Sequence, residues 1–207
     1  MPQSDCNTVT VYGSITACPG KKAIAGVRRR LYYIEKASVA AFPSLPAITG
    51  ASGQKMEDLA VLSGEFTLAA DKYFKHIDLK DEASNVTFEA VGENGSQLFN
   101  NQANAIVTGI GDEVKGFSRQ ALNDDLIFIY QNRDGSFCMI GNEAFTCHTT
   151  PSGDTGSEAT GAITTTLAIQ CYDEAPVPTF KGKLYIAEGT YIDCADGQEK
   201  TDPEDNG

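Results

Sequence analysis

Residues 126–141 read Leu-Ile-Phe-Ile-Tyr-Gln-Asn-Arg-Asp-Gly-Ser-Phe-Cys-Met-Ile-Gly, and this stretch decides the fold class. The run at 126–130 is apolar and aromatic and has the length of a strand, which predicts a central β-strand. The turn at 132–135 ends in a glycine that can adopt the positive φ of a tight hairpin. Residues 136–141 then predict the return strand.

A helical pattern precedes this hairpin. Val114, Phe117, Ala121 and Leu122 recur at the spacing of one helix face. Asp112 is of a residue type that caps helix N-termini. Because the apolar stripe lies on one side only, it predicts a helix that covers a core, and we expect this helix on the outer face of the sheets.

Strand patterns account for much of the remaining chain. They lie at 27–34, 59–70, 73–79, 86–91, 98–107, 162–172 and 184–192. The patterns on either side of the charged turn at 80–84 predict a β-hairpin over 73–91. The Pro-, Gly-, Ser- and Thr-rich segments 37–58 and 149–161 predict loops. About nine or ten strands with one helix predict a mainly β fold, a two-sheet β-sandwich or barrel with one flanking α-helix.

Length and charge narrow the class of protein. A chain of 207 residues suits one domain, and we expect a single β-sandwich domain over 1–186 followed by a solvated, acidic C-terminal extension over 187–207. The net charge of −12 disfavours a protein that grips nucleic acid by its phosphates. No apolar run is long enough for a transmembrane helix and no secretory signal is visible, so no membrane partner is expected.

The cysteines are scattered and form no CxxC pair. They are Cys6, Cys18, Cys138, Cys147, Cys171 and Cys194. We expect reduced, structural thiols, with Cys6 and Cys18 as the first pair to consider for a disulfide. One conceivable metal site across neighbouring strands has a spacing that matches no usual zinc pattern; it consists of Cys138, Cys147, His148 and Cys171.

No pairing of a nucleophile with a base stands out. His76 lies within a strand pattern, and the adjacent Cys147 and His148 would point to opposite faces of a strand. Asp124 and Asp125 follow the helix and are expected to end it and to bond to the turn. We therefore expect no enzymatic activity, no catalytic or metal-ligating residue and no cofactor.

The order of these elements resembles that of the tail tube (major tail) proteins of tailed bacteriophages and related contractile systems. The residues that carry the resemblance are Gly-Asp-Glu-Val-Lys-Gly-Phe at 111–117, Asn-Asp-Asp-Leu-Ile-Phe-Ile at 123–129, Arg-Asp-Gly-Ser-Phe-Cys-Met-Ile-Gly at 133–141, Thr-Gly-Ala-Ile-Thr-Thr-Thr-Leu at 160–167, and Ala175-Pro176. Residues 26–34 and 42–46 also resemble structural proteins of phages that infect gut Bacteroidetes.

The resemblance implies a structural virion protein. Six copies would form a ring, and stacked rings would form the channel through which DNA is ejected without specific binding. The protein would assemble in the bacterial host cytoplasm and reside in the virion tail, with its own copies and other tail proteins as partners. Residues 37–58 would be the arm to the next ring, with 149–161 as a second contact. A tail terminator, baseplate hub or head–tail connector stays open as an alternative. So does a monomeric, non-viral β-sandwich that is a binding module or a hydrolase with a site built from loop residues.

Acidic residues are expected to line such a channel. Asp78, Asp81, Glu82 and Glu89 all belong to the hairpin predicted over 73–91. A carboxylate wall repels DNA phosphates over about 8 Å at physiological salt, which suffices in a narrow channel. The alternative is that the acidic charge only keeps the free subunit soluble.

Overall fold

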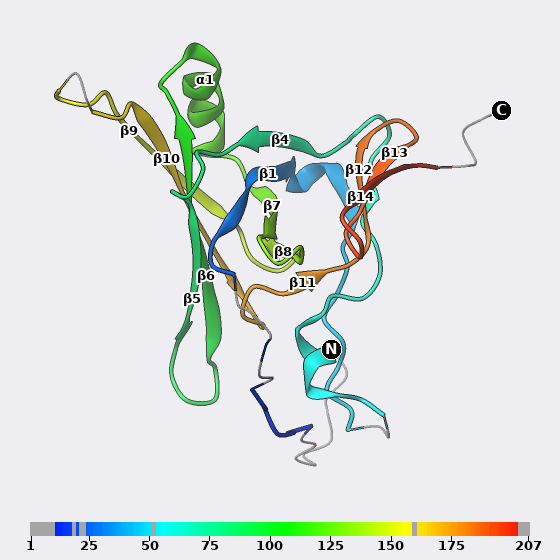
Figure 1. Ribbon diagram of the computed structural model, residues 1–207. Coiled ribbons are helices and arrows are strands. Elements are labelled where there is room, and N and C mark those ends of the chain that lie inside the picture. The colour runs from blue at the N-terminus through cyan, green and yellow to red at the C-terminus, as the bar shows by residue number, and fades with distance from the viewer. Residues whose placement is uncertain (1–10, 18–19, 21–23, 51–52, 159–160, 203–207) are drawn as a thin grey trace.

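The computed structural model describes residues 11–17, 20, 24–50, 53–158 and 161–202 (Figure 1). Within these residues the fold is mainly β with a single α-helix, and it contains the two-sheet sandwich that the sequence predicts. None of the helices in the described ranges is both long and apolar enough to cross a membrane. Cys6 and Cys18 lie outside the described residues.

The first sheet has five strands in the order β11-β8-β7-β1-β4. Their bounds are β1 (Val27–Glu35), β4 (Lys75–Asp78), β7 (Leu126–Asn132), β8 (Phe137–Ile140) and β11 (Thr179–Phe180). Strand β7 is the central one, and it pairs with β8 through the predicted hairpin. Gly135 has the positive φ of 101° that the turn needs. The prediction for residues 126–141 is therefore confirmed.

The second sheet has four antiparallel strands in the order β5-β6-β10-β9. Their bounds are β5 (Asn85–Val91), β6 (Leu98–Thr108), β9 (His148–Asp154) and β10 (Thr164–Asp173). The β5–β6 and β9–β10 hairpins project from opposite ends of this sheet (Figure 1). Between the two sheets, Phe128 and Ile140 face Ala103, Ala105 and Leu167. Small residues opposite a fully buried phenylalanine let the sheets pack closely.

The five-stranded sheet is covered on its other face as well. Ile127, Ile129 and Met139 pack there with Phe66 and Phe180. The covering layer contains the connection with η1 (Lys36–Ser38), β2 (Val39–Ala41), η2 (Met56–Ala60) and β3 (Thr67–Leu68), and the sheet of β12 (Lys183–Ala187), β13 (Thr190–Asp193) and β14 (Gln198–Thr201). Burial on both faces explains why the run at 126–130 is apolar without alternation. Strands β7 and β8 are thus buried on both faces, whereas β4 and the start of β1 are largely exposed. The four-stranded sheet has one face that stays open along all of its strands.

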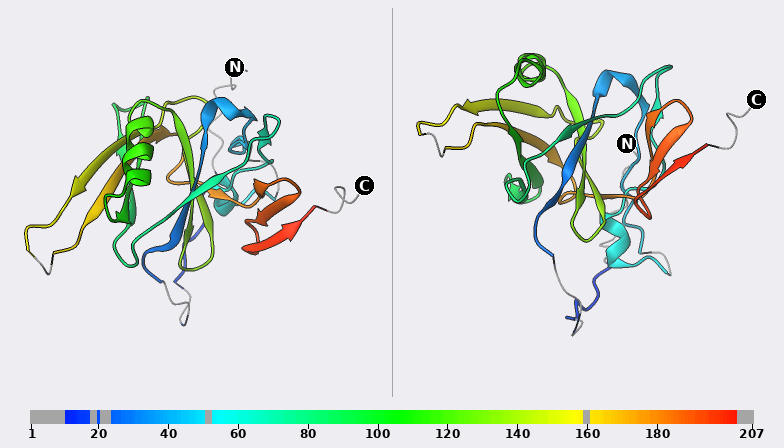
Figure 2. Two further views of the ribbon diagram at one scale, coloured as in Figure 1. Left: turned by 90° about the horizontal axis from the view of Figure 1, so that it is seen from above. Right: turned by 45° about the horizontal axis from the view of Figure 1, so that its top comes forward.

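The helix α1 (Asp112–Ala121) forms as predicted, but with Gly111 rather than Asp112 as its N-cap. Its residues Val114, Phe117 and Ala121 pack into the core between the two sheets. The helix therefore closes one end of the sandwich (Figure 1, and from above in Figure 2), and the expectation that it lies on an outer face is wrong. The helical stripe identified a buried side but carried no information on which surface would bury it.

The hairpin predicted over 73–91 does not form. Strand β4 pairs with β1 in the first sheet, whereas β5 pairs with β6 in the second. The intervening turn crosses between the sheets, because the Leu79 amide bonds to the Arg29 carbonyl and the Lys80 amide bonds to the Ile106 carbonyl. Alternation and a charged turn predicted two strands and a reversal correctly, but pairing depends on distant residues.

Three other expectations are also corrected. Most of 59–70 is irregular, and residues 149–154 of the loop expected over 149–161 form strand β9, where threonine favours the strand and Pro151 is tolerated at an edge. The boundary expected after residue 186 falls inside β12. Ile192 and Cys194 belong to the second core cluster, so the chain through Thr201 is part of the folded body.

Candidate functional site

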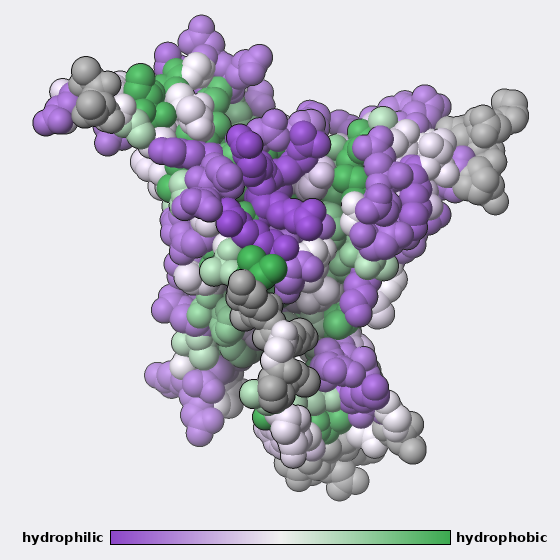
Figure 3. Space-filling model, viewed as in Figure 1, coloured by the Kyte–Doolittle hydropathy of each residue, from purple (hydrophilic) through white to green (hydrophobic). Residues whose placement is uncertain are grey.

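The four carboxylates expected to line a channel do not share one surface. Asp78 on β4 forms an ion pair with Arg30, at 3.1 Å, and the surface over β1 and β4 is strongly hydrophilic (Figure 3). Asp81 and Glu82, in the crossing turn, both pair with Arg133, at 3.1 and 3.4 Å. Glu89 alone lies on the four-stranded sheet.

The exposed side of the four-stranded sheet, which we call the outer sheet face, is the largest feature that sequence reasoning missed. Its members follow from strand alternation and the register of the four strands. They are Asn85, Thr87, Glu89, Val91, Leu98, Asn100, Gln102, Asn104, Ile106, Thr108, His148, Thr150, Ser152, Asp154, Thr164, Thr166, Ala168, Gln170 and Tyr172. Within this set the charged groups are Glu89 and Asp154, and there is no lysine or arginine.

Amide side chains organise this face. Glu89 Oε1 accepts hydrogen bonds from Asn100 Nδ2 at 3.1 Å and from Gln102 Nε2 at 2.9 Å. Asn104 Nδ2 donates to Asn85 Oδ1 at 3.4 Å. The carboxylate is thus held by neutral donors instead of a cation. The signal was visible in the sequence, where Asn100, Gln102 and Asn104 stand at every second position and are followed by the alternating small residues Ala103 and Ala105.

Both long edges of this sheet are open. Strands β5 and β9 are its end strands, and no other strand pairs with them in the described part of the chain. Just before β9, the amide of Cys147 donates to Asp125 Oδ1 at 2.8 Å, and on β9 Pro151, which has no amide hydrogen, lies opposite Leu167. Odd-numbered residues of β9 therefore turn their backbone groups toward the free edge, where Thr149 and Gly153 keep their N–H groups.

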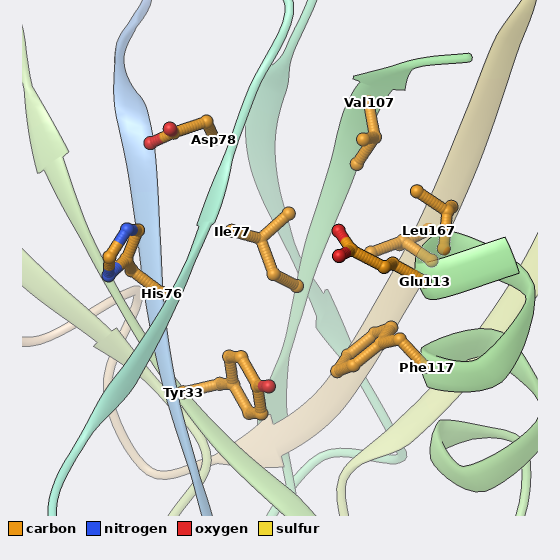
Figure 4. A pocket seen from close by; sticks show the side chains of 9 residues that line it. Tyr33, His76, Ile77, Asp78, Val107, Glu113, Phe117 and Leu167 are labelled. Atoms are coloured by element: carbon orange, nitrogen blue, oxygen red, sulfur yellow. The ribbon is translucent and has the colours of Figure 1, made fainter. Parts of the chain in front are cut away.

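A hollow of about 410 Å³ lies between β4 and α1. Ile77, Glu113 and Phe117 point into it, and His76 lines its rim, with a side chain that leaves β4 on the opposite side from Ile77 (Figure 4). The His76 ring instead packs edge-on against Tyr32, with the ring centroids 6.4 Å apart. Glu113 and His76 therefore form no acid–base pair, and the hollow supports no catalytic assignment.

The conceivable metal ligands do not converge. His148 is exposed on the outer sheet face, while Cys147 and Cys171 face the core, as strand alternation predicts. Cys138 lies on β8 of the other sheet. Among the described residues, no group of three His, Cys, Asp or Glu side chains could hold a metal ion.

Asp125 has a structural role, but its side chain bonds to distant segments and not to its own turn as expected. Besides accepting the Cys147 amide, it forms an ion pair with Lys36 at 3.3 Å. Lys36 Nζ also donates to the Phe145 carbonyl at 2.8 Å. These contacts tie the start of β7 and the end of β1 to the segment that leads into β9.

Asp173 is the one buried carboxylate in the described ranges. Burial raises the pKa of its side chain, although the Asn142 amide and the backbone amides of Glu174 and Ala175 oppose this shift. Because a raised pKa makes the ionised form unfavourable in the folded state, Asp173 costs stability at neutral pH. This cost disappears as the pH falls through the raised pKa toward the ordinary value.

Asp173→Asn is therefore expected to raise the thermal unfolding midpoint at pH 7, with a gain that shrinks as the pH is lowered toward about 4. Midpoints measured by circular dichroism between these two pH values test this. Asp154→Asn, at an exposed position, is the control and should leave the midpoint unchanged. A lower midpoint for Asp173→Asn at pH 7 would contradict the prediction.

Two segments project from the folded body, the first at one end of the four-stranded sheet and the second on the far side of the five-stranded sheet (Figure 1). The first is the β9–β10 hairpin, and the second is the connection over 37–58. Gln54 closes the outer loop of this connection, because it donates to the Ala47 carbonyl at 2.8 Å and accepts from the Gly50 amide at 3.1 Å.

Comparison of the chain with protein-family models, with curated proteins and with solved structures gave no match. The geometry of the outer sheet face and its open edges therefore carries the functional interpretation.

Proposed function

We propose that this protein is a structural subunit of a phage tail tube, which forms hexameric rings that stack into the channel for DNA ejection. The observation that supports this proposal most is the outer sheet face with its two open edges. The central strands β7 and β8 of the five-stranded sheet are buried on both faces, so the four-stranded sheet is the large sheet with a continuous face available to line a channel. Virion tail localisation and assembly in a bacterial host belong to the same proposal.

Ring formation follows from the edges. An unpaired strand edge is a template for pairing with another chain. If β5 of one copy joins β9 of the next, the contact is head-to-tail, and a rotation that closes produces a ring. The joined sheets then form a barrel without free edges, and the outer sheet face of every copy lies inside it.

The chemistry of the outer sheet face suits passage of DNA. Hydroxyl and amide side chains keep the wall hydrated, and the absence of Lys and Arg from this face removes the cations that would hold phosphates. Of the four carboxylates expected at the lumen, this arrangement keeps Glu89 and adds Asp154. The 37–58 connection and the β9–β10 tip project beyond the sheet and are the proposed contacts to the next ring.

Assembly is tested on the purified full chain over a concentration series, by mass photometry and electron microscopy. We expect rings with a central channel, and tubes at high concentration. Rings that never stack would favour the terminator or connector alternative. A protein that stays monomeric at every concentration would contradict the tube proposal and favour the binding module.

The edge contact is tested at one position with a matched pair of variants. Gly153→Pro removes an N–H group that faces the free edge of β9, whereas Gly153→Ala keeps it and places a Cβ at an ordinary 3.5 Å from Ile110 Cδ1. Loss of one hydrogen bond at each contact is expected to raise the concentration needed for assembly by about tenfold for proline alone. Normal assembly of a folded Gly153→Pro variant would exclude the β9 edge as the contact.

A further inference from the structure

Cys147 and Cys171 lie side by side in the core. The pairing of β9 with β10 ends at His148 opposite Gln170, so the next residues on each strand, Cys147 and Cys171, also stand opposite each other. Each side chain is only 1% exposed, and both belong to the core cluster between the two sheets.

The local backbone geometry brings the two Cβ atoms close. The Cys147 amide donates to Asp125 Oδ1 and so cannot donate to the Cys171 carbonyl. The two residues therefore occupy a non-hydrogen-bonded position of the antiparallel pair, where opposite Cα atoms are about 4.5 Å apart. This separation lies within the range of natural disulfides. In the closed fold a hydrogen bond with Cys171, followed by burial, raises the pKa of the Cys147 thiol well above its usual value, so this thiol forms the reactive thiolate once β9 opens.

We propose that Cys147 and Cys171 are a site of covalent modification: on exposure to a small-molecule disulfide or an equivalent oxidant they form a cross-strand disulfide. With glutathione disulfide, the thiolate of one cysteine attacks a glutathione sulfur and releases one glutathione thiol. The second cysteine then attacks the protein sulfur of this mixed disulfide and releases the other glutathione. Two protons and two electrons pass from the protein thiols to two glutathione molecules, and one S–S bond forms in the protein.

The remaining described cysteines lack such a partner. Cys138 lies on β8 and accepts a hydrogen bond from Asn132, and Cys194 packs in the second core cluster. The oxidant reaches the buried pair when the edge strand β9 opens locally. The disulfide then closes the β9–β10 hairpin at its base and holds the open edge of the outer sheet face in place. This inference does not depend on the tail tube proposal.

Peptide mapping of the full chain tests the site directly. The protein is incubated with glutathione disulfide, alkylated under denaturing conditions and cleaved after glutamate. Cleavage after Glu143, Glu158 and Glu174 separates Cys147 from Cys171 and both from Cys138. We expect one cross-linked product that joins peptides 144–158 and 159–174 and separates on reduction. Alkylation of both cysteines in the oxidised sample, or a bond to another cysteine, would overturn the proposal.

The oxidised protein is also expected to unfold at a temperature about 5–10 °C higher than the reduced protein. Cys147→Ala and Cys171→Ala should each abolish this difference, whereas Cys138→Ala, at another buried cysteine, should keep it. If an alanine variant fails to fold, the mapping of the unmodified sequence still decides. An equal midpoint for the oxidised and reduced protein, with the cross-link present, would refute the stabilising effect.

Discussion

Phe128→Ala is expected to lower the free energy of unfolding by about 3–5 kcal/mol. Phe128 is completely buried on the central strand β7, and it packs between the two sheets near Ala103 and Ala105. Because these neighbours are small and belong to long, continuously paired strands, they cannot move in to fill the space that the ring leaves. The loss therefore includes both the transfer of the ring to water and the cavity. Urea denaturation followed by circular dichroism measures it.

Phe88→Ala is the matched control for this prediction. Phe88 lies on the β5–β6 hairpin and is 56% exposed, so its replacement is expected to change the free energy of unfolding by less than about 1 kcal/mol. A cost for Phe128→Ala similar to that of Phe88→Ala would show that the inter-sheet core is not packed as described.

Gly141→Ala is expected to cost about 2–5 kcal/mol of unfolding free energy. Gly141 follows β8 and has a φ of +117°, which side-chain-bearing residues rarely adopt. A Cβ at this position would lie 2.7 Å from Ile127 Cδ1 and 3.3 Å from Ile127 Cα. The second of these atoms is backbone of the central strand, so the clash cannot be relieved by a side-chain rotation alone. Denaturant titration of the folded variant, or its failure to fold, reports the cost.

Gly135→Ala separates the two causes of this effect. Gly135 also has a positive φ, of +101°, but a Cβ there would meet no atom within 4 Å. Backbone strain alone is expected to cost about 1–2 kcal/mol. If both alanine variants lose the same amount, the close approach of Gly141 to Ile127 contributes nothing.

The features that could be predicted from sequence are those that neighbouring residues specify. The pairing of β7 with β8 could be predicted from residues 126–141 alone, because a short glycine turn brings the two strands together. The stripe of Val114, Phe117 and Ala121 likewise predicted α1 from within one segment. The strand pattern over 184–192 likewise became the neighbouring strands β12 and β13.

The outer sheet face depended on pairing between distant segments. Residues 100–105 carry alternating amides, yet their role is apparent only when β5, β10 and β9 lie beside β6 in register. The strand register places the proposed lumen residue Glu89 next to its amide partners. Asp78 and Asp81 lie on other surfaces. The juxtaposition of Cys147 and Cys171 has the same origin.

The sequence by itself determined which segments are strands or helix over most of the core, since periodicity and turn chemistry act within a few residues. The tertiary structure decided which strands pair, which sheet is buried on both faces and which face stays open. These choices depend on the summed burial of apolar side chains from segments far apart in the chain, and shifting a strand to another partner changes all of those contacts at once.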